Sequence, residues 1–286
     1  MGWLLYFGII ALQAIILKYN VRMTRRLGQL EATALAYFQM RNLRIVKTGD
    51  MVAALRITAK QERELLSRMA RARMIANVRR GLYLVPAKLP LAAAWAPDDA
   101  AVINALMTDK HVRYQITGPN AFNRYGYDEQ IPARITIYND IFSSERRIGQ
   151  VSLTLIKVNR NRLGGVERVS TPSGQTLIYS SRARTLVDAI YDWSRFDSLP
   201  RAYGWIRQDI EAARIRPDEL AKMAILYGNL ATIRRIGALL EQMGSDRRVL
   251  RRLERSLTTS TAKIPFVPGQ TVRGILLKRW GIVVNG

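Results

Sequence analysis

The sequence predicts an α+β fold in two domains. A small helical module comes first, and a mixed sheet with an appended C-terminal helical bundle follows it. Apolar residues recur at helical spacing in 27–73 and again in 182–257, whereas the stretch between them contains short runs that alternate apolar and polar residues. The length of 286 residues, 48% of them hydrophobic, is enough for a buried core in each of two domains.

Composition restricts the chemistry that the chain can perform. It has no cysteine and one histidine, which excludes disulfides, thiol nucleophiles, Cys-type zinc sites and His-rich metal centres. Its 45 Lys and Arg exceed its 22 Asp and Glu, for a formal charge of +23. An anionic partner is therefore expected, and charge alone leaves nucleic acid, an acidic protein surface and a membrane face open.

The first segment is apolar but short. Residues 3–17 are almost wholly apolar, yet they are fewer than the roughly 20 residues that cross a bilayer core. No basic residue precedes this run, and no small-residue cleavage site follows it. Because Met23 opens a second, ordinary N-terminal sequence, we expect residues 1–22 to be an upstream extension rather than a membrane anchor. We expect no membrane partner and a cytoplasmic protein.

Residues 23–90 contain the pattern of three helices. Apolar spacing predicts a first helix over 27–42. Thr48 is positioned to cap a short second helix, and Thr58 is positioned to cap a third that reaches about Arg73. The short interval between the second and third helices predicts a tight turn.

A hairpin is predicted directly after the third helix. Two short apolar runs lie on either side of Arg79, Arg80 and Gly81, as in a hairpin with a basic tip. Three helices followed by a hairpin are typical of a winged helix-turn-helix. We therefore predict this fold for 23–90.

The third helix has a basic outer face. A step of 100° per residue places Lys60, Arg63, Ser67 and Arg71 opposite the apolar residues. Such a helix fits the major groove, where Lys60, Arg63 and either Gln61 or Ser67 would contact base edges. The alternative is a small helical domain with a solvated basic face.

Charge density favours DNA binding over that alternative. Residues 22–90 contain 15 Lys or Arg and 4 Asp or Glu, a net charge of +11 in 69 residues, whereas residues 91–286 spread the same net charge over 196. Each phosphate that a cation neutralises releases condensed counterions. We predict double-stranded DNA as the partner of this module. The predicted DNA-binding residues are Lys47, Thr58, Lys60, Gln61, Arg63, Ser67, Arg71, Arg79 and Arg80.

Residues 91–286 are predicted to form the second, α+β domain. A short helix is expected over 98–109, before the strands begin. The aromatic residues Phe122, Tyr125 and Tyr127 lie in a turn-rich loop, where they would either stack on bases or fill a core. The predicted strands are residues 111–117, 134–138, 151–158 and 175–180.

From Ser181 onward the pattern is helical. Ser181 and Asn229 are positioned to cap helices, and Pro200 and Pro217 are positioned to precede or open them. A last helix is expected from 246 to 257, followed by extended segments at 265–269 and 280–285. The second domain is therefore predicted to end in a helical bundle.

A possible second basic face lies in this bundle. Seven arginines fall between residues 234 and 255, with few acidic residues among them. They would meet an acidic surface of a partner protein, contact phosphates beyond the first module, or form a solvated face that aids solubility. These residues are Arg234, Arg235, Arg247, Arg248, Arg251, Arg252 and Arg255.

Motifs for catalysis are absent from the sequence. It has no GxxxxGK[ST] loop, no GxGxxG after a strand and no GxSxG turn. Asp188 and Asp192 stand four residues apart on one helical face and could hold a divalent ion, but pairing with Arg184 or Arg195 is the ordinary alternative. His111 has no second metal ligand beside it. We expect no enzymatic activity, no catalytic residue, no metal and no cofactor.

Both halves of the chain resemble one family. The run 27–86, above all MIANVRRGLYLVP at 74–86, resembles the N-terminal winged helix of the AbiEi-family antitoxins of type IV toxin-antitoxin systems. RTLVDAIYD at 184–192 and the stretch 220–244 resemble the C-terminal antitoxin domain of that family. The resemblance covers 24–286 in domain order.

The resemblance implies two roles. The winged helix would repress the protein's own operon by binding operator DNA, with inverted repeats as the expected operators. The second domain would counteract a nucleotidyltransferase toxin encoded nearby, functionally if not by a stable complex, as in abortive infection and phage defence. Two rival classes remain open: a winged-helix transcriptional regulator whose second domain binds a ligand or dimerises, and an enzyme acting on the toxin or its nucleotide.

Overall fold

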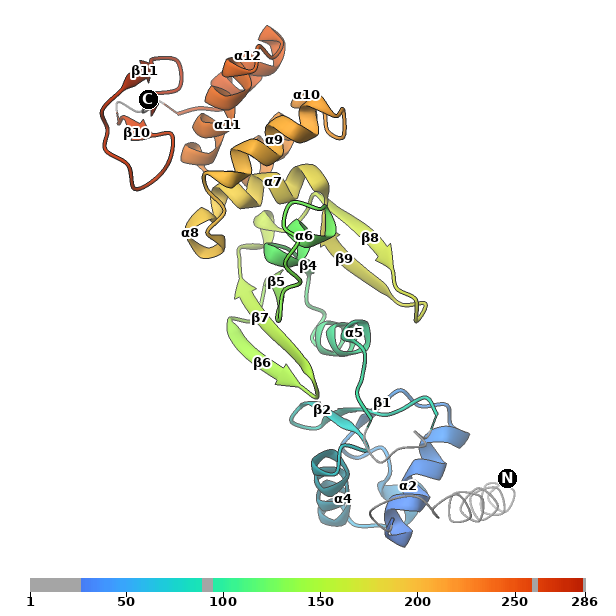
Figure 1. Cartoon of the computed structure of the whole chain (residues 1–286). Coiled ribbons are helices and arrows are strands. Elements are labelled where there is room, and N and C mark those ends of the chain that lie inside the picture. The colour runs from blue at the N-terminus through green and yellow to red at the C-terminus, as the bar shows by residue number, and fades with distance from the viewer. Residues whose placement is uncertain (1–26, 89–94, 259–261, 285–286) are drawn as a thin grey trace. The chain divides into compact units, whose positions relative to one another are not determined.

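The computed structural model describes residues 27–88, 95–258 and 262–284 (Figure 1). The predicted extension, residues 1–22, lies outside the described residues. The chain divides into two compact units: the first runs through His111 and includes 146–152, and the second contains 112–145 and the residues from 153 onward. Both units combine helices with strands, so the predicted α+β class is confirmed. This division differs from the predicted boundary at 90 and 91, because the helix over 99–109 belongs to the first unit.

The first unit contains the predicted winged helix. Its helices are α2 (Gln29–Met40), α3 (Val52–Leu55), α4 (Ala59–Arg71) and α5 (Asp99–Asp109). Its strands are β1 (Ile45–Lys47), β2 (Ala76–Arg79) and β3 (Leu82–Leu84), which form an antiparallel sheet in the order β1-β3-β2. Phe38, Met51, Leu65, Leu66 and Met69 are almost completely buried among these elements.

A six-stranded mixed sheet contains all four strands predicted in the middle of the chain. Its order is β6-β7-β5-β4-β9-β8. Strand β5 runs parallel to β7 and antiparallel to β4, and β9 runs parallel to β4 and antiparallel to β8. The strands are β4 (Tyr114–Ile116), β5 (Ile135–Asn139), β6 (Ser144–Ile148), β7 (Val151–Lys157), β8 (Val166–Ser170) and β9 (Thr176–Ser180).

The helices predicted from Ser181 onward are present, and the structure adds α6 (Pro119–Arg124), inside the predicted turn-rich loop, and the short α8 (Trp193–Phe196). The Ser181 hydroxyl accepts from the backbone N–H of Arg184, and the Asn229 side chain accepts from that of Thr232. The other helices are α7 (Arg182–Tyr191), α9 (Arg201–Glu211), α10 (Pro217–Tyr227), α11 (Leu230–Gln242) and α12 (Arg247–Arg255). A single-turn 3-10 helix spans Arg160–Arg162.

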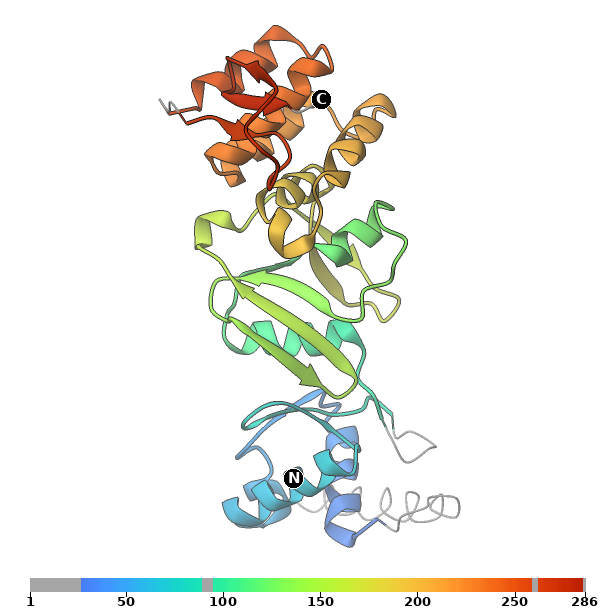
Figure 2. The ribbon, with the colours of Figure 1, turned by 60° about the vertical axis from the view of Figure 1, so that its left-hand side comes forward.

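The end of the chain forms a small sheet rather than isolated extended segments. Strands β10 (Ile264–Pro265), β11 (Ile275–Leu277) and β12 (Ile282–Val284) pair in the order β10-β12-β11. Figure 2 shows this sheet lying over α11. Trp280, which is 1% exposed, packs so closely on α11 that a Cβ atom at Gly237 would lie 2.3 Å from its ring. The sheet therefore completes the core of the helical bundle.

Among the described residues, the helices are all too short or too polar to cross a membrane.

Candidate nucleic-acid interface

Helix α4 presents a polar face outward, as predicted. Lys60, Arg63, Ser67 and Arg71 are all exposed. The opposite side of the helix, with Leu65, Leu66 and Met69, is fully buried. None of the three basic residues on this face forms an ion pair within the described part of the chain. Their charges therefore face solvent.

A buried carboxylate fixes the turn between α3 and α4. Glu62 is 0% exposed, and its two oxygens accept from the backbone N–H groups of Gly49 at 2.6 Å and Met51 at 2.8 Å. These N–H groups lie at the start of the second helix, where the sequence predicts Thr48 as the cap. That prediction is wrong because Thr48 lies in a turn, donating its N–H to the Gly81 carbonyl oxygen, and the carboxylate of α4 takes the capping role. Glu62 thereby links the two helices of the helix-turn-helix.

Thr58 and Gln61 cap α4 reciprocally. The Thr58 hydroxyl accepts from the Gln61 backbone N–H at 3.2 Å, and the Gln61 side-chain oxygen accepts from the Thr58 backbone N–H at 2.8 Å. The predicted cap at Thr58 is confirmed. The side-chain amide nitrogen of Gln61 remains a donor at the exposed first turn, so both residues are placed at the end of the helix that enters the groove in helix-turn-helix complexes.

The wing is the hairpin of β2 and β3, and β1, which pairs with β3, lies beside it. The predicted DNA-binding cations of these three strands differ in whether an acidic residue pairs with them. Arg79 and Lys47 flank Leu82 in the sheet register, and both contact the Asp109 carboxylate of α5: Arg79 Nε donates at 2.6 Å and Lys47 Nζ lies 3.5 Å away. Arg80, at the tip, is exposed and has no acidic partner among the described residues. Of the wing cations, Arg80 is therefore the one whose charge is not already neutralised.

Asp109 is held as a carboxylate between those two cations. Its side chain is 5% exposed, and such burial by itself raises the pKa. The hydrogen bonds and charges of Arg79 and Lys47 outweigh burial and hold the pKa of Asp109 below its usual range. The side chain therefore keeps its negative charge and ties α5 to the wing.

Glu64 shares the exposed face of α4 and was not included among the predicted residues. The helical step places it between Lys60 and Arg68, and it is exposed. A carboxylate on a recognition helix accepts from the N4 amino group of cytosine and repels phosphates. Helical spacing in the sequence already places Glu64 on this face. The predicted set does not contain it because that set was selected for basic and hydroxyl or amide side chains.

The predicted second basic face is smaller than the sequence suggested. Arg234 and Arg235 are only 5% and 7% exposed, and they donate to backbone carbonyl groups of the C-terminal sheet. Arg234 contacts the carbonyl oxygens of Trp280, Ala262 and Gly281, and Arg235 those of Phe266 and Pro265. Burial lowers the pKa of both guanidinium groups. These two residues anchor the sheet to α11 and are not part of a surface.

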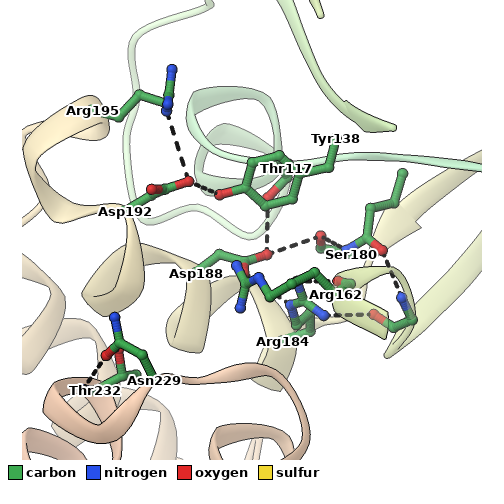
Figure 3. A network of polar contacts seen from close by, with 12 residues as sticks. Thr117, Tyr138, Arg162, Ser180, Arg184, Asp188, Asp192, Arg195, Asn229 and Thr232 are labelled. Carbon is green, nitrogen blue, oxygen red and sulfur yellow. Dashed lines mark hydrogen bonds and ion pairs between the residues drawn. The ribbon is translucent and has the colours of Figure 1, made fainter. Parts of the chain in front are cut away.

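Asp188 is engaged in ion pairs, which is the alternative that the sequence offered to a divalent-ion site (Figure 3). Arg184 and Asp188 are both 0% exposed, and Arg184 Nε donates to Asp188 Oδ1 at 2.9 Å. Arg162 Nη2 donates to the same oxygen at 3.2 Å. The other oxygen, Oδ2, accepts from the Thr117 hydroxyl at 3.1 Å and lies 3.4 Å from that of Ser180. Both carboxylate oxygens are therefore occupied.

The same network joins three elements of the second unit. Gln115 of β4 donates to the hydroxyl of Ser180 in β9 at 2.7 Å and accepts from the Gly164 N–H at 2.9 Å. Arg184 of α7 also donates to the carbonyl oxygens of Gly164 and Arg162. The network holds α7 against the sheet and against the loop at 160–165, which is a scaffolding role.

Asp192 is the second of the two paired aspartates. The Tyr138 hydroxyl donates to it, and Arg195 Nε lies 3.8 Å from it. Burial, with the nearby charges of Asp188 and Asp192, raises the pKa of Tyr138 well above its ordinary value, so its hydroxyl stays protonated. Pairing of the two aspartates with Arg184 and Arg195, the alternative to a divalent-ion site, is confirmed. Within the described ranges, His, Asp and Glu form no cluster of three that could hold a metal ion.

The aromatic loop fills a core rather than presenting rings to solvent. Phe122 is 2% exposed and lies 5.0 Å from the Trp205 ring centroid, and Tyr127 stacks on the same ring at 5.3 Å. The Tyr127 hydroxyl also donates to Asp209. Of the two interpretations of this loop, packing is confirmed for these two residues.

Comparison with known proteins assigns no activity. A model for a family of unknown function (DUF6088) matches residues 50–178, which is less than half of the chain. No curated protein matches. Among solved structures, the RV2827C protein from Mycobacterium tuberculosis is similar with a TM-score of 0.55 and 15% identity, over 91% of this chain and 92% of that one. At this identity the similarity shows the fold alone, an α+β arrangement with sheets and a helical C-terminal region.

Proposed function

We propose that this protein binds double-stranded operator DNA through α4 and the wing. The observation that carries the proposal is the exposed basic face of α4, presented by a helix-turn-helix whose turn is held by Glu62. In such folds the second helix of the motif enters the major groove of DNA, and the wing lies along the sugar-phosphate backbone of the DNA. Lys60, Arg63 and Ser67 then contact base edges, and Arg71 and Arg80 contact phosphates.

Substitutions on this face are expected to separate base contacts from phosphate contacts. Lys60→Ala and Arg63→Ala should weaken binding to the promoter fragment about 5- to 150-fold each, because a good side-chain contact to a base is worth about 1–3 kcal/mol. Binding to unrelated DNA should change much less. Arg80→Ala should weaken both to a similar extent and reduce the dependence of affinity on salt by about one unit of slope. Gel-shift titration on both DNAs measures these effects.

Control variants remove the same charge elsewhere. Lys222 on α10 and Arg207 on α9 are exposed and lie in the second unit. Lys222→Ala and Arg207→Ala should leave promoter binding within about twofold of wild type. Unchanged binding in all three variants of the first unit would show that α4 and the wing are not the docking face.

We further propose that the protein is an antitoxin and autorepressor that acts in the cytoplasm, has no catalytic activity of its own and requires no cofactor. The support is the resemblance to AbiEi-family antitoxins, whose matching segments 184–192 and 220–244 fall on α7 and on α10 with α11. These helices share one hydrophobic core. The proposed partner is a nucleotidyltransferase toxin encoded nearby, which the second unit counteracts without a required stable complex. Inverted repeats are the proposed operators.

Growth rescue tests the antitoxin role. Wild-type protein and the variant Lys60→Ala/Arg63→Ala/Arg71→Ala are each expressed from an independent promoter with the neighbouring toxin. Both should restore growth, because the substitutions lie in the first unit, while only the wild type should repress a reporter placed behind the operon promoter. If neither chain rescues growth although both are folded, the antitoxin assignment is wrong, and a DNA-binding regulator with a ligand-binding or dimerising second unit takes its place.

A further inference from the structure

The outer side of α12 is covered by arginines. All five are exposed, while Leu250 and Leu253 of the same helix are buried. A step of 100° per residue places the five within a sector of about 140°, and a rise of 1.5 Å per residue spreads them over about 12 Å. We call this set the α12 arginine face. It consists of Arg247, Arg248, Arg251, Arg252 and Arg255.

Acidic residues near this face are already engaged. The Asp246 side chain accepts from the Arg248 backbone N–H and so caps the helix. Glu254 pairs with Arg279 at 2.7 Å, and Glu241 contacts both Arg279 and the indole N–H of Trp280. Among the described residues, no carboxylate forms an ion pair with the α12 arginine face. Its charge is therefore uncompensated within the described ranges.

This arrangement is unfavourable for the isolated helix. Arg247 with Arg251, Arg248 with Arg252, and Arg251 with Arg255 are like charges at i and i+4, which repel each other. Arg247 and Arg248 also stand in the first turn, where the helix dipole disfavours cations. A bound polyanion removes both penalties at once, so the face is better suited to a ligand than to solvent.

We propose that the α12 arginine face binds the phosphodiester backbone of nucleic acid, as a phosphate-contacting surface separate from α4 and the wing. Guanidinium groups match phosphate oxygens bidentately, and the face consists of arginine alone, without lysine. A protein–protein hot spot combines arginine with aromatic residues in a well-packed, desolvated pocket. The apolar residues of α12 point into the core instead, with Val249 and Leu257 packed against it. The chemistry of this face recognises repeated phosphates and carries no base readout.

The test measures salt dependence on the full-length chain. The parent is the Lys60→Ala/Arg63→Ala/Arg71→Ala variant, so that α4 does not dominate binding. Adding Arg248→Ser, Arg251→Ser and Arg252→Ser should lower affinity for random-sequence duplex DNA at least about tenfold at low salt. It should also reduce the slope of log K against log salt by up to about 2.7, since each phosphate contact contributes about 0.9. Fluorescence anisotropy with duplex DNA and with RNA of the same sequence identifies the preferred polymer, and loss on either supports the proposal.

A matched control separates this face from net charge. Arg168, Arg207 and Arg273 are exposed and scattered over β8, α9 and the segment before β11. Replacing these three with Ser removes the same charge and should leave the slope near that of the parent. Replacing Arg248, Arg251 and Arg252 with Lys should retain most of the slope. The melting temperature of the α12 Ser variant should stay close to that of the parent, because relief of like-charge repulsion offsets the lower helix propensity of serine.

Two results would overturn the proposal. One is an equal loss of slope in the scattered variant and in the α12 Ser variant, which would reduce the effect to net charge. The other is tighter binding of poly-glutamate than of either nucleic acid, which would make the face a docking site for an acidic protein. Failure of the α4 proposal gives a different result. In that case the parent variant, Lys60→Ala/Arg63→Ala/Arg71→Ala, would bind the promoter as tightly as the wild type does.

Discussion

Glu62→Ala is expected to destabilise the helix-turn-helix by about 3 kcal/mol or more. The carboxylate is completely buried and accepts from the backbone N–H groups of Gly49 and Met51. Removing it leaves two donors at the start of α3 without partners, and each buried unsatisfied group costs about 1–3 kcal/mol. Because α3 and α4 are linked through this residue, DNA affinity should fall with stability even though Glu62 does not reach the surface.

Hydrogen exchange measured by mass spectrometry resolves this effect within the full-length chain. Peptides covering residues 45–71 should exchange faster in Glu62→Ala, whereas peptides from α9 to α11 should be unchanged. Glu64→Ala is the matched control, since Glu64 lies on the same helix but is exposed. Its effect on stability should stay within about 0.5 kcal/mol, as for surface substitutions in general. Equal exchange in the two variants would show that Glu62 does not hold the turn.

The capping residues show what local sequence predicts and where it fails. Thr58, Ser181 and Asn229 cap helices as predicted, because an N-cap bond joins residues only two or three positions apart. Thr48 fails because the donors at the start of α3 are satisfied by Glu62, thirteen residues after Gly49. A carboxylate arriving from the next helix leaves no mark in the local pattern.

The strands that periodicity does not predict lie at sheet edges. Strands β6 and β8 are the two edges of the six-stranded sheet, and β1 and β11 are edges of the smaller ones. SERRI at 144–148 and VERVS at 166–170 are mostly polar or half-exposed. Periodicity detects a strand through its buried face, whereas an edge strand is held chiefly by backbone pairing to its neighbour. Internal strands such as β5 and β7, with several fully buried positions, were predicted for the same reason.

The candidate site residues also differ in how far the sequence could predict their roles. The exposed face of α4 follows from helical geometry, so Lys60, Arg63, Ser67 and Arg71 could be placed from the sequence. The roles of four other predicted residues depend on contacts between distant parts of the sequence. Lys47 and Arg79 pair with Asp109. Arg234 and Arg235 donate to backbone carbonyl groups near the end of the chain. A run of arginines therefore predicts a basic surface only if no carboxylate or carbonyl group elsewhere in the fold binds their guanidinium groups.

Asp188→Ala is expected to destabilise the second unit by about 3–5 kcal/mol. Removing the carboxylate leaves the Arg184 guanidinium buried without its counter-charge, and an uncompensated buried charge has a cost of that size. It also leaves the hydroxyls of Thr117 and Ser180 without their shared acceptor. Denaturant unfolding followed by tryptophan fluorescence reports mainly on this unit, because three of the five tryptophans, Trp193, Trp205 and Trp280, belong to it.

The double variant Arg184→Met/Asp188→Leu separates two quantities: the net contribution of the ion pair to the free energy of unfolding, and the loss of stability when only one partner is removed. Replacing both charges with apolar groups of similar size removes the desolvation penalty together with the attraction, so the double variant should be more stable than Asp188→Ala. An exposed pair of the same residue types, Arg216 with Asp218 at 3.1 Å, provides the control. Asp218→Ala should cost at most about 1 kcal/mol because both side chains are solvated. If Asp188→Ala cost no more than Asp218→Ala, the network would not be what holds α7 to the sheet.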